Sequence, residues 1–235
     1  MRVKSLIMAV ATAVVAFAAA GAVAQGEPAP ATAAANVSLP AIYFLAPVGA
    51  VLALVFAFMF YRSVMSNSEG DENMVRIAQA VREGAYAYLG AQRKVVLLVF
   101  VVLCAVLAIM AFGFNLQNEM TFVGVFVAGL LSGLCGFFGM KTATNASART
   151  THAAKQSLND GLRVAFRAGA VMGLCVTGFA LLDVSVWFII LTQVIGMTDL
   201  VSITTITLSF AMGASLQALF ARVGGGIYTK AADVG

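Results

Sequence analysis

The sequence predicts an all-α protein, a bundle of helices that crosses a membrane several times. Two observations lead to this fold class. First, 61% of the 235 residues are hydrophobic and only 10% are charged, with a mean hydropathy of +0.96, whereas a soluble domain is nearer half apolar and a quarter charged. Second, uncharged apolar runs of about twenty residues recur along the chain, and this length spans a bilayer as a helix.

Residues 1–24 have the pattern of a secretory signal peptide. Arg2 and Lys4 give a basic start, residues 6–20 are apolar, and Ala22-Val-Ala24 matches a small-x-small cleavage site. The alternative for this segment is an uncleaved signal helix. Both versions place the following residues on the outer side of the membrane.

The rest of the chain divides into a linker and a membrane domain. Residues 25–40 form a polar linker rich in proline and alanine, a composition that does not build a core of its own. Residues 41–235 are assigned to a transmembrane domain. Five spans are predicted within it, at 41–61, 95–114, 121–140, 164–182 and 201–221.

Two segments next to these spans have their own pattern. Asp183 interrupts the apolar run after the fourth span, and 184–197 is apolar again. This pattern allows either one very long helix or a helix followed by an interfacial segment. Segment 74–94 has helical periodicity, and we interpret it as a cytoplasmic extension of the second span rather than as a partner-binding helix.

The basic residues orient the predicted spans. Lys and Arg gather after the first, third and fifth spans, whereas the connections 115–120 and 183–200 contain neither. The positive-inside rule therefore places the three basic regions in the cytoplasm, with the protein in the inner membrane of the cell. These regions contain Arg62, Arg76, Arg82, Arg93, Lys94, Lys141, Arg149, Lys155, Arg163, Arg167, Arg222 and Lys230.

Small residues recur at four-residue spacing in two spans. Gly129 and Gly133 lie in the third span, and Gly169 and Gly173 lie in the fourth. Glycine at this spacing lets helices approach closely, so we expect a compact bundle. The pattern occurs in channels, transporters and inert scaffolds alike, and it specifies no chemistry.

Cysteine and histidine give no sign of a metal centre or a disulfide framework. Cys104, Cys135 and Cys175 lie inside apolar runs and are interpreted as small buried hydrophobic residues. His152 has no Cys or His neighbour at the spacing of metal ligands.

The segment after the fifth span carries the candidate site residues. Arg222, three consecutive glycines at 224–226, Lys230 and Asp233 follow one another there. Lys230 is suited to bind a phosphate oxygen, and Asp233 lies on the same face if a helix continues, where a carboxylate can bind Mg²⁺. A snorkelling lysine with a solvated aspartate remains the alternative. Arg222 faces either a polar pathway or the membrane interface.

The sequence resembles the membrane-bound, ion-translocating inorganic pyrophosphatases. Four stretches carry the resemblance, in the family's order. They are Arg82-Glu-Gly-Ala-Tyr-Ala-Tyr-Leu89 and residues 136–149, 161–174 and 213–235, the last of which includes Gly224-Gly-Gly-Ile-Tyr-Thr-Lys230. The resemblance covers the chain from about residue 41 to its end, and it implies that residues 41–235 are the N-terminal part of the family's transmembrane pump domain, which we expect to be incomplete.

The resemblance implies an enzyme that hydrolyses Mg²⁺-pyrophosphate at its cytoplasmic side and moves Na⁺ or H⁺ outward across the lipid bilayer. It implies a homodimer, K⁺ as a candidate activator, and no nucleic-acid partner. By this similarity Lys230 contacts pyrophosphate, Asp233 belongs to the acidic set that binds the Mg²⁺-substrate, and Arg222 lies in the coupling region above the ion gate. The pattern of residues 139–167 resembles the K⁺-stimulated sodium pumps more than the proton pumps.

The family's other acidic motifs have no counterpart in these residues. We therefore assign no catalytic residue within the chain, and we expect the isolated chain to lack pyrophosphatase activity, because one lysine and one carboxylate cannot arrange several Mg²⁺ ions and a water. The alternative function is a non-enzymatic, multi-span scaffold or channel subunit.

Overall fold

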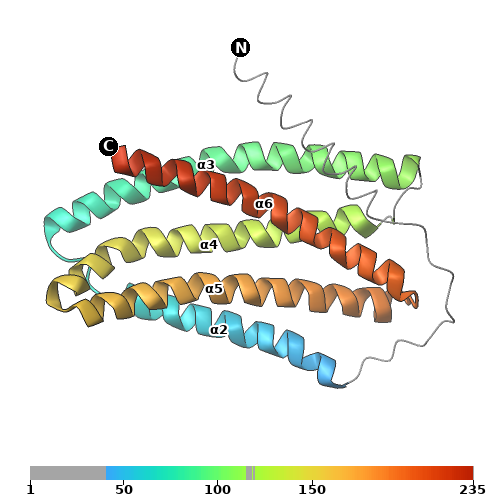
Figure 1. Cartoon of the computed structure of the whole chain (residues 1–235), viewed down its shortest axis with the longest axis horizontal. Helices are drawn as coiled ribbons and strands as arrows, with labels where there is room; N and C mark the ends of the chain where they lie inside the picture. Colours follow the sequence, from blue (N-terminus) through green and yellow to red (C-terminus); the bar gives the residue numbers. More distant parts are fainter. Residues whose placement is uncertain (1–40, 115–117, 119, 235) are drawn as a thin grey trace, which may run out of the picture.

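Long helices make up nearly all of the structure, a computed structural model that describes residues 41–114, 118 and 120–234 (Figure 1). The predicted signal segment 1–24 and linker 25–40 lie outside the described residues. The helices are η1 (Ala41–Phe44), α2 (Leu45–Met65), α3 (Glu72–Ala108), η2 (Ile109–Gly113), α4 (Met120–Gln156), α5 (Leu158–Ile189), η3 (Ile190–Val194) and α6 (Leu200–Val234).

Five helices of the described residues are long and apolar enough to cross a membrane. Each predicted span falls in one of them, so the predicted all-α transmembrane bundle is confirmed. Segment 74–94 is continuous with the second span inside α3, as predicted. Of the two alternatives at Asp183, the long helix is correct, because α5 passes through this residue and continues as the π-helix η3.

The chain runs back and forth, so that its connections gather at two ends (Figure 1). The 66–71 linker, the α4–α5 turn at Ser157 and the last turns of α6 lie at one end, which we call the basic end. α4 packs against α3, α5 and α6, and α2 packs on α5. The predicted basic regions therefore meet in space at one end of the bundle.

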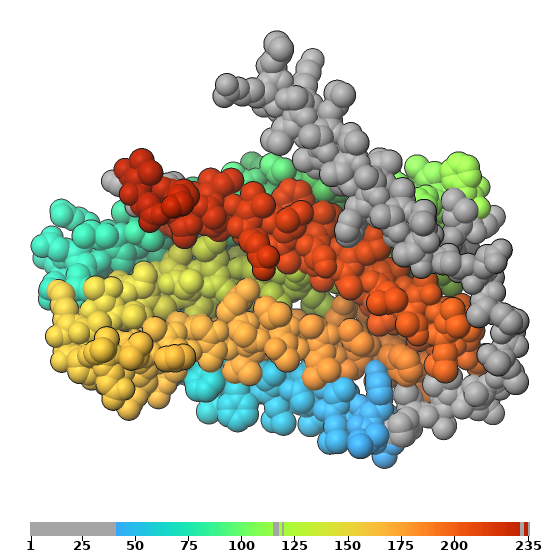
Figure 2. Space-filling model, in the orientation of Figure 1, coloured from blue at the N-terminus to red at the C-terminus, as the bar shows by residue number. Residues whose placement is uncertain are grey.

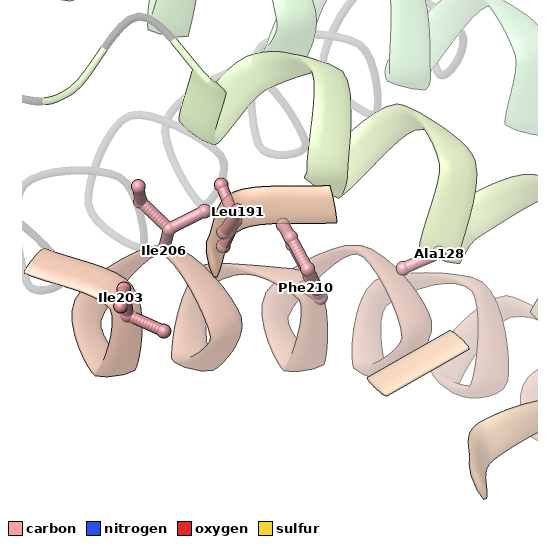
Figure 3. Close-up of a cluster of buried hydrophobic side chains, with 5 residues drawn as sticks. All are labelled: Ala128, Leu191, Ile203, Ile206 and Phe210. Carbon is pink, nitrogen blue, oxygen red and sulfur yellow. The ribbon is translucent and has the colours of Figure 1, made fainter. Parts of the chain in front are cut away.

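Close packing in the bundle uses glycine in α4. The Phe210 ring of α6 occupies the place that a Cβ at Gly124 would fill, and the Phe100 ring of α3 does the same at Gly129. The close approach predicted for Gly129 is thus confirmed, and Gly133 lies next to Gln217. Phe210 also belongs to a buried apolar cluster that joins α4, η3 and α6 (Figure 3). The cluster comprises Ala128, Leu191, Ile203, Ile206 and Phe210.

The same prediction is wrong for α5. At Gly169 and Gly173 no atom lies within 4 Å of a Cβ built on the backbone. These two glycines face open space among the described residues. The close contacts of α5 lie at other glycines: Gly178 packs on Leu54, and Gly161 packs on Ala154.

The outer surface of α2 is apolar. Along one edge of the bundle (Figure 2) α2 exposes Leu45, Val48, Val51, Leu52, Val55, Phe56, Phe58 and Met59. Such a continuous apolar face is unfavourable in water and suits lipid. The three cysteines are free; Cys135 and Cys175 are buried and Cys104 is half-buried, in line with their prediction as apolar packing residues.

Candidate functional site

The end of α6 carries the predicted site residues, and it remains helical through its three glycines to Val234. The Lys230 Nζ lies 3.3 Å from the Asp233 Oδ2, and both side chains are largely exposed, at 83% and 64%. The expectation that Asp233 shares a face with Lys230 is confirmed. The pair presents one cation and one carboxylate to the surroundings of the basic end.

Arg222 is exposed and precedes Asp233 by about three helical turns, so the two residues share a face of α6. No hydrogen bond or ion pair joins the Arg222 guanidinium to the residues that the structure describes. The exposed end of α6 therefore carries Arg222 and Asp233 on one face. Lys230 lies next to this face, three residues before Asp233. This arrangement can bind an anion together with the cation that accompanies it.

Helix α3 contacts the same part of α6. The Gln92 Nε2 donates a hydrogen bond to the Phe220 carbonyl oxygen at 2.6 Å, and the Tyr228 hydroxyl donates to the Val81 carbonyl oxygen at 2.6 Å. The rings of Tyr88 and Tyr228 pack with their centroids 6.3 Å apart. Sequence reasoning missed these contacts, because their partners are more than a hundred residues apart in the chain.

A second polar cluster lies beside this contact, where the 66–71 linker meets α3 and α4. The Arg82 guanidinium donates to both oxygens of Glu69, each at 2.8 Å, and to the Asn145 Oδ1 at 3.0 Å. The Arg149 Nη1 lies 2.8 Å from the Glu69 Oε1, and its Nε donates to the Asn67 carbonyl oxygen. Sequence reasoning gave Arg82 and Arg149 no site role, although both fall within the stretches that carry the family resemblance, a signal that could have found them.

Electrostatics in this cluster favour the ionised carboxylate. Hydrogen bonding from Arg82 holds the pKa of Glu69 below its ordinary value of 4.5, and the nearby charges of Arg149 and Arg82 act in the same direction. The side chains of Glu69, Arg82 and Arg149 are each at least four-fifths buried. The cluster is therefore a charged, shielded connection between the linker, α3 and α4.

Metal ligands are sparse in the part of the chain that the structure describes. Within it, no group of three or more His, Cys, Asp and Glu residues could hold a metal ion. The His152 imidazole lies against Gly70, in space that a Cβ at that position would need. Asp233 alone can supply a carboxylate oxygen next to Lys230, which fits a Mg²⁺ ion that arrives bound to phosphate oxygens and keeps its waters.

Comparison with known proteins assigns the family. Residues 51–235 match the family described as inorganic H⁺ pyrophosphatase. The chain belongs to this family. The match includes α3, α4, α5 and the whole of α6, so the polar cluster and the Lys230–Asp233 pair both lie within it.

Relatives in the pyrophosphatase family carry names of ion pumps. The chain is 55% identical over 200 residues to the "Putative K(+)-stimulated pyrophosphate-energized sodium pump" of Bacteroides thetaiotaomicron. The matched region covers 83% of this chain and 27% of that protein. It is 38% identical over 193 residues to a K⁺-insensitive pyrophosphate-energized proton pump of Methanosarcina mazei, and the match covers 82% of this chain and 26% of that protein. It is 35% identical over 208 residues to a K⁺-stimulated sodium pump of Thermotoga maritima, and the match covers 83% of this chain and 27% of that protein.

The chain thus spans about a quarter of the length of these pyrophosphatase relatives. Family membership and a multi-span membrane fold are established by the match and by the helices. The recognition of the family from its motifs is confirmed.

Proposed function

We propose that this chain forms part of a pyrophosphate-energised ion pump, in which hydrolysis of Mg²⁺-pyrophosphate at the basic end drives Na⁺ or H⁺ outward. The family match over residues 51–235 carries this proposal, because it includes the exposed end of α6 with its cation and carboxylate. Charge supports the cytoplasmic placement of this end, since the three predicted basic regions of the described helices lie there.

Lys230 would bind a phosphate oxygen of the substrate. Its ammonium lies at the tip of a side chain that is 83% exposed, so it can reach an anion without desolvating first. Asp233 would bind the Mg²⁺ that comes with pyrophosphate, and that ion neutralises charge on the phosphate oxygens. With substrate present, the 3.3 Å contact between Lys230 and Asp233 gives way to contacts with the anion and the cation.

Arg222 would act in coupling. It lies about three turns below Asp233 on the same face of α6, toward the membrane. A guanidinium at this depth is costly unless a polar pathway or a partner group faces it. We propose that it links events at the pyrophosphate site to the path of the ion.

Sodium is the proposed cargo, and K⁺ is the proposed activator. The relative with 55% identity is named a K⁺-stimulated sodium pump, and the proton pump of Methanosarcina mazei is 38% identical. A homodimer, as the family resemblance implies, is proposed for the assembled pump.

The test uses a full-length pump that carries this segment, reconstituted in liposomes. We expect Lys230→Met and Asp233→Asn each to reduce Mg²⁺-dependent phosphate release by about 10²–10³-fold, the usual effect of removing one charge-stabilising group. Arg222→Gln should reduce Na⁺ uptake more than hydrolysis. Lys155→Met and Asp71→Asn, an exposed ion pair at the same end, serve as matched controls. Unchanged hydrolysis in both site variants would refute the assignment.

A further inference from the structure

The last turns of α6 are intrinsically weak as a helix. Three consecutive glycines at 224–226 end four residues before Lys230 and seven before Asp233, and each glycine costs a helix about 1 kcal/mol relative to alanine. A flexible helix end cannot place a cation and a carboxylate at fixed positions. Contacts with another helix must therefore define where this end lies.

Two hydrogen bonds from α3 and α6 lie on either side of the glycines. Gln92 binds the carbonyl of Phe220 before them, and Tyr228 binds the carbonyl of Val81 after them, each at 2.6 Å. The two helices are antiparallel here (Figure 1), so the residue that comes earlier in α3, Val81, pairs with the one that comes later in α6, Tyr228. The glycine segment is thus fixed at both of its ends.

Gly224 leaves room for the ends of two α3 side chains. A Cβ on its backbone would lie 2.6 Å from the Tyr88 hydroxyl oxygen and 2.7 Å from the Gln92 Oε1. These distances are shorter than real Cβ contacts, so the ends of the Tyr88 and Gln92 side chains would have to shift to admit a larger residue here. At Gly225 and Gly226 no atom lies within 4 Å of the corresponding position.

The contact with α3 also sets the direction of the site residues. Lys230 follows Tyr228 by two positions, which is a rotation of about 200° around a helix. Since Tyr228 faces α3, the Lys230 side chain faces the opposite way, in agreement with its high exposure. Any rotation of α6 that breaks the Tyr228 bond turns Lys230 away from this direction.

α3 is itself fixed at this level. The Glu69–Arg82–Arg149 cluster joins α3 to the 66–71 linker and to α4, one residue from the Val81 carbonyl that accepts from Tyr228. The path from α4 to the site therefore runs through charged and hydrogen-bonded groups on α3.

We propose that Tyr228 and Gln92 are positioning residues: by fixing the glycine segment of α6 on α3, they set the position of Lys230 and Asp233 for binding Mg²⁺-pyrophosphate. This inference rests on the proposed function for the role of the pair. The geometric part of it, that these two side chains fix the end of α6, does not depend on any substrate.

The first experiment measures that geometry in this chain. Spin labels on Leu158→Cys and Val234→Cys, in a background without the three native cysteines, report the distance between the α4–α5 turn and the end of α6; both positions are highly exposed. We expect Tyr228→Phe and Gln92→Leu each to broaden or shift the distance distribution, and the double variant to do so most. An unchanged distribution in the double variant overturns the proposal.

Matched controls separate the lost hydrogen bonds from the change of residue type. Tyr61→Phe removes a hydroxyl that has no hydrogen-bond partner among the described residues. Gln79→Leu removes an exposed amide on α3 whose hydrogen bond goes to Glu83 of the same helix. Both should leave the distribution as in the unaltered chain. Gly224→Ala, whose Cβ would displace the ends of Tyr88 and Gln92, should broaden it.

The second experiment measures the consequence in a full-length pump that carries this segment. Loss of one hydrogen bond should raise KM for Mg²⁺-pyrophosphate by roughly two- to tenfold, with a smaller effect on kcat. A broadened distribution with unchanged KM would show that the contact is structural only and would overturn the positioning role. If the unaltered pump neither hydrolyses nor binds pyrophosphate, the proposed function fails, while the distance measurement still decides the geometry.

Discussion

The Arg82 guanidinium binds Glu69 through two parallel hydrogen bonds, Nη1 to Oε1 and Nη2 to Oε2, each 2.8 Å long. The planar fork of arginine matches a carboxylate in this geometry, which makes the pair stronger than a single contact. Arg149 completes the cluster from α4. One carboxylate in the 66–71 linker thereby connects two helices whose arginines lie far apart in sequence.

Replacement of this carboxylate should destabilise the bundle. We expect Glu69→Gln to lower the free energy of unfolding by about 1–3 kcal/mol, because it leaves two shielded guanidinium groups with a neutral partner. The thermal midpoint in detergent measures this. Asp71→Asn is the control, since its ion pair with Lys155 is exposed and is worth at most about 1 kcal/mol. Equal midpoints for the two variants would contradict the prediction.

The same carboxylate predicts an acid-sensitive stability. Its pKa in the folded chain is lowered below 4.5, so its contribution is fully present above that pH and is lost as pH falls through the lowered folded pKa. We expect the difference in thermal midpoint between the unaltered chain and Glu69→Gln to be constant near neutral pH and to shrink below about pH 4.5. A difference that persists unchanged in acid would argue against this.

Glycine packing gives a prediction with an internal control. A Cβ at Gly213 of α6 would collide with the Val125 backbone carbonyl of α4, which cannot swing aside as a side chain can. Gly213→Ala should therefore destabilise the chain by about 1–3 kcal/mol. Gly173→Ala meets open space in α5 and should leave the thermal midpoint unchanged or raise it, because alanine favours a helix by about 1 kcal/mol over glycine.

Orientation in the membrane can be measured by labelling from outside. In a background without native cysteines, we expect a membrane-impermeant maleimide to label Thr198→Cys on intact cells. Asn73→Cys and Asn159→Cys, both exposed at the basic end, should be labelled only after the membrane is opened. The reverse pattern would place the basic end outside and would exclude the proposed cytoplasmic site.

A chain of these 235 residues alone should release no phosphate from Mg²⁺-pyrophosphate. Hydrolysis needs several charges arranged around the phosphates and an oriented water, whereas the exposed end of α6 offers Lys230 and Asp233. Phosphate release from the purified chain in detergent is the measurement. Activity that depends on Mg²⁺ and disappears in Lys230→Met would disprove this expectation.

Local patterns were sufficient for several parts of the fold and the site. The five spans, the helical extension at 74–94 and the shared face of Lys230 and Asp233 follow from apolar length and helical spacing. The same reasoning failed for Gly169 and Gly173, because a small residue permits close approach but does not determine which helix comes near. It also gave no hint that Glu69 is the partner of Arg82 and Arg149.

The sequence by itself therefore determined the number of described spans, their helical nature and the gathering of positive charge on alternate connections, since each of these depends on the composition of one continuous segment. Only the tertiary structure decided which faces meet: that the Tyr228 hydroxyl reaches the Val81 carbonyl across 147 positions of the chain, and that Gly224 fits against Tyr88 and Gln92. The physical reason is that such contacts depend on the complementary shapes and hydrogen-bonding groups of two distant segments, which become defined only when the helices pack.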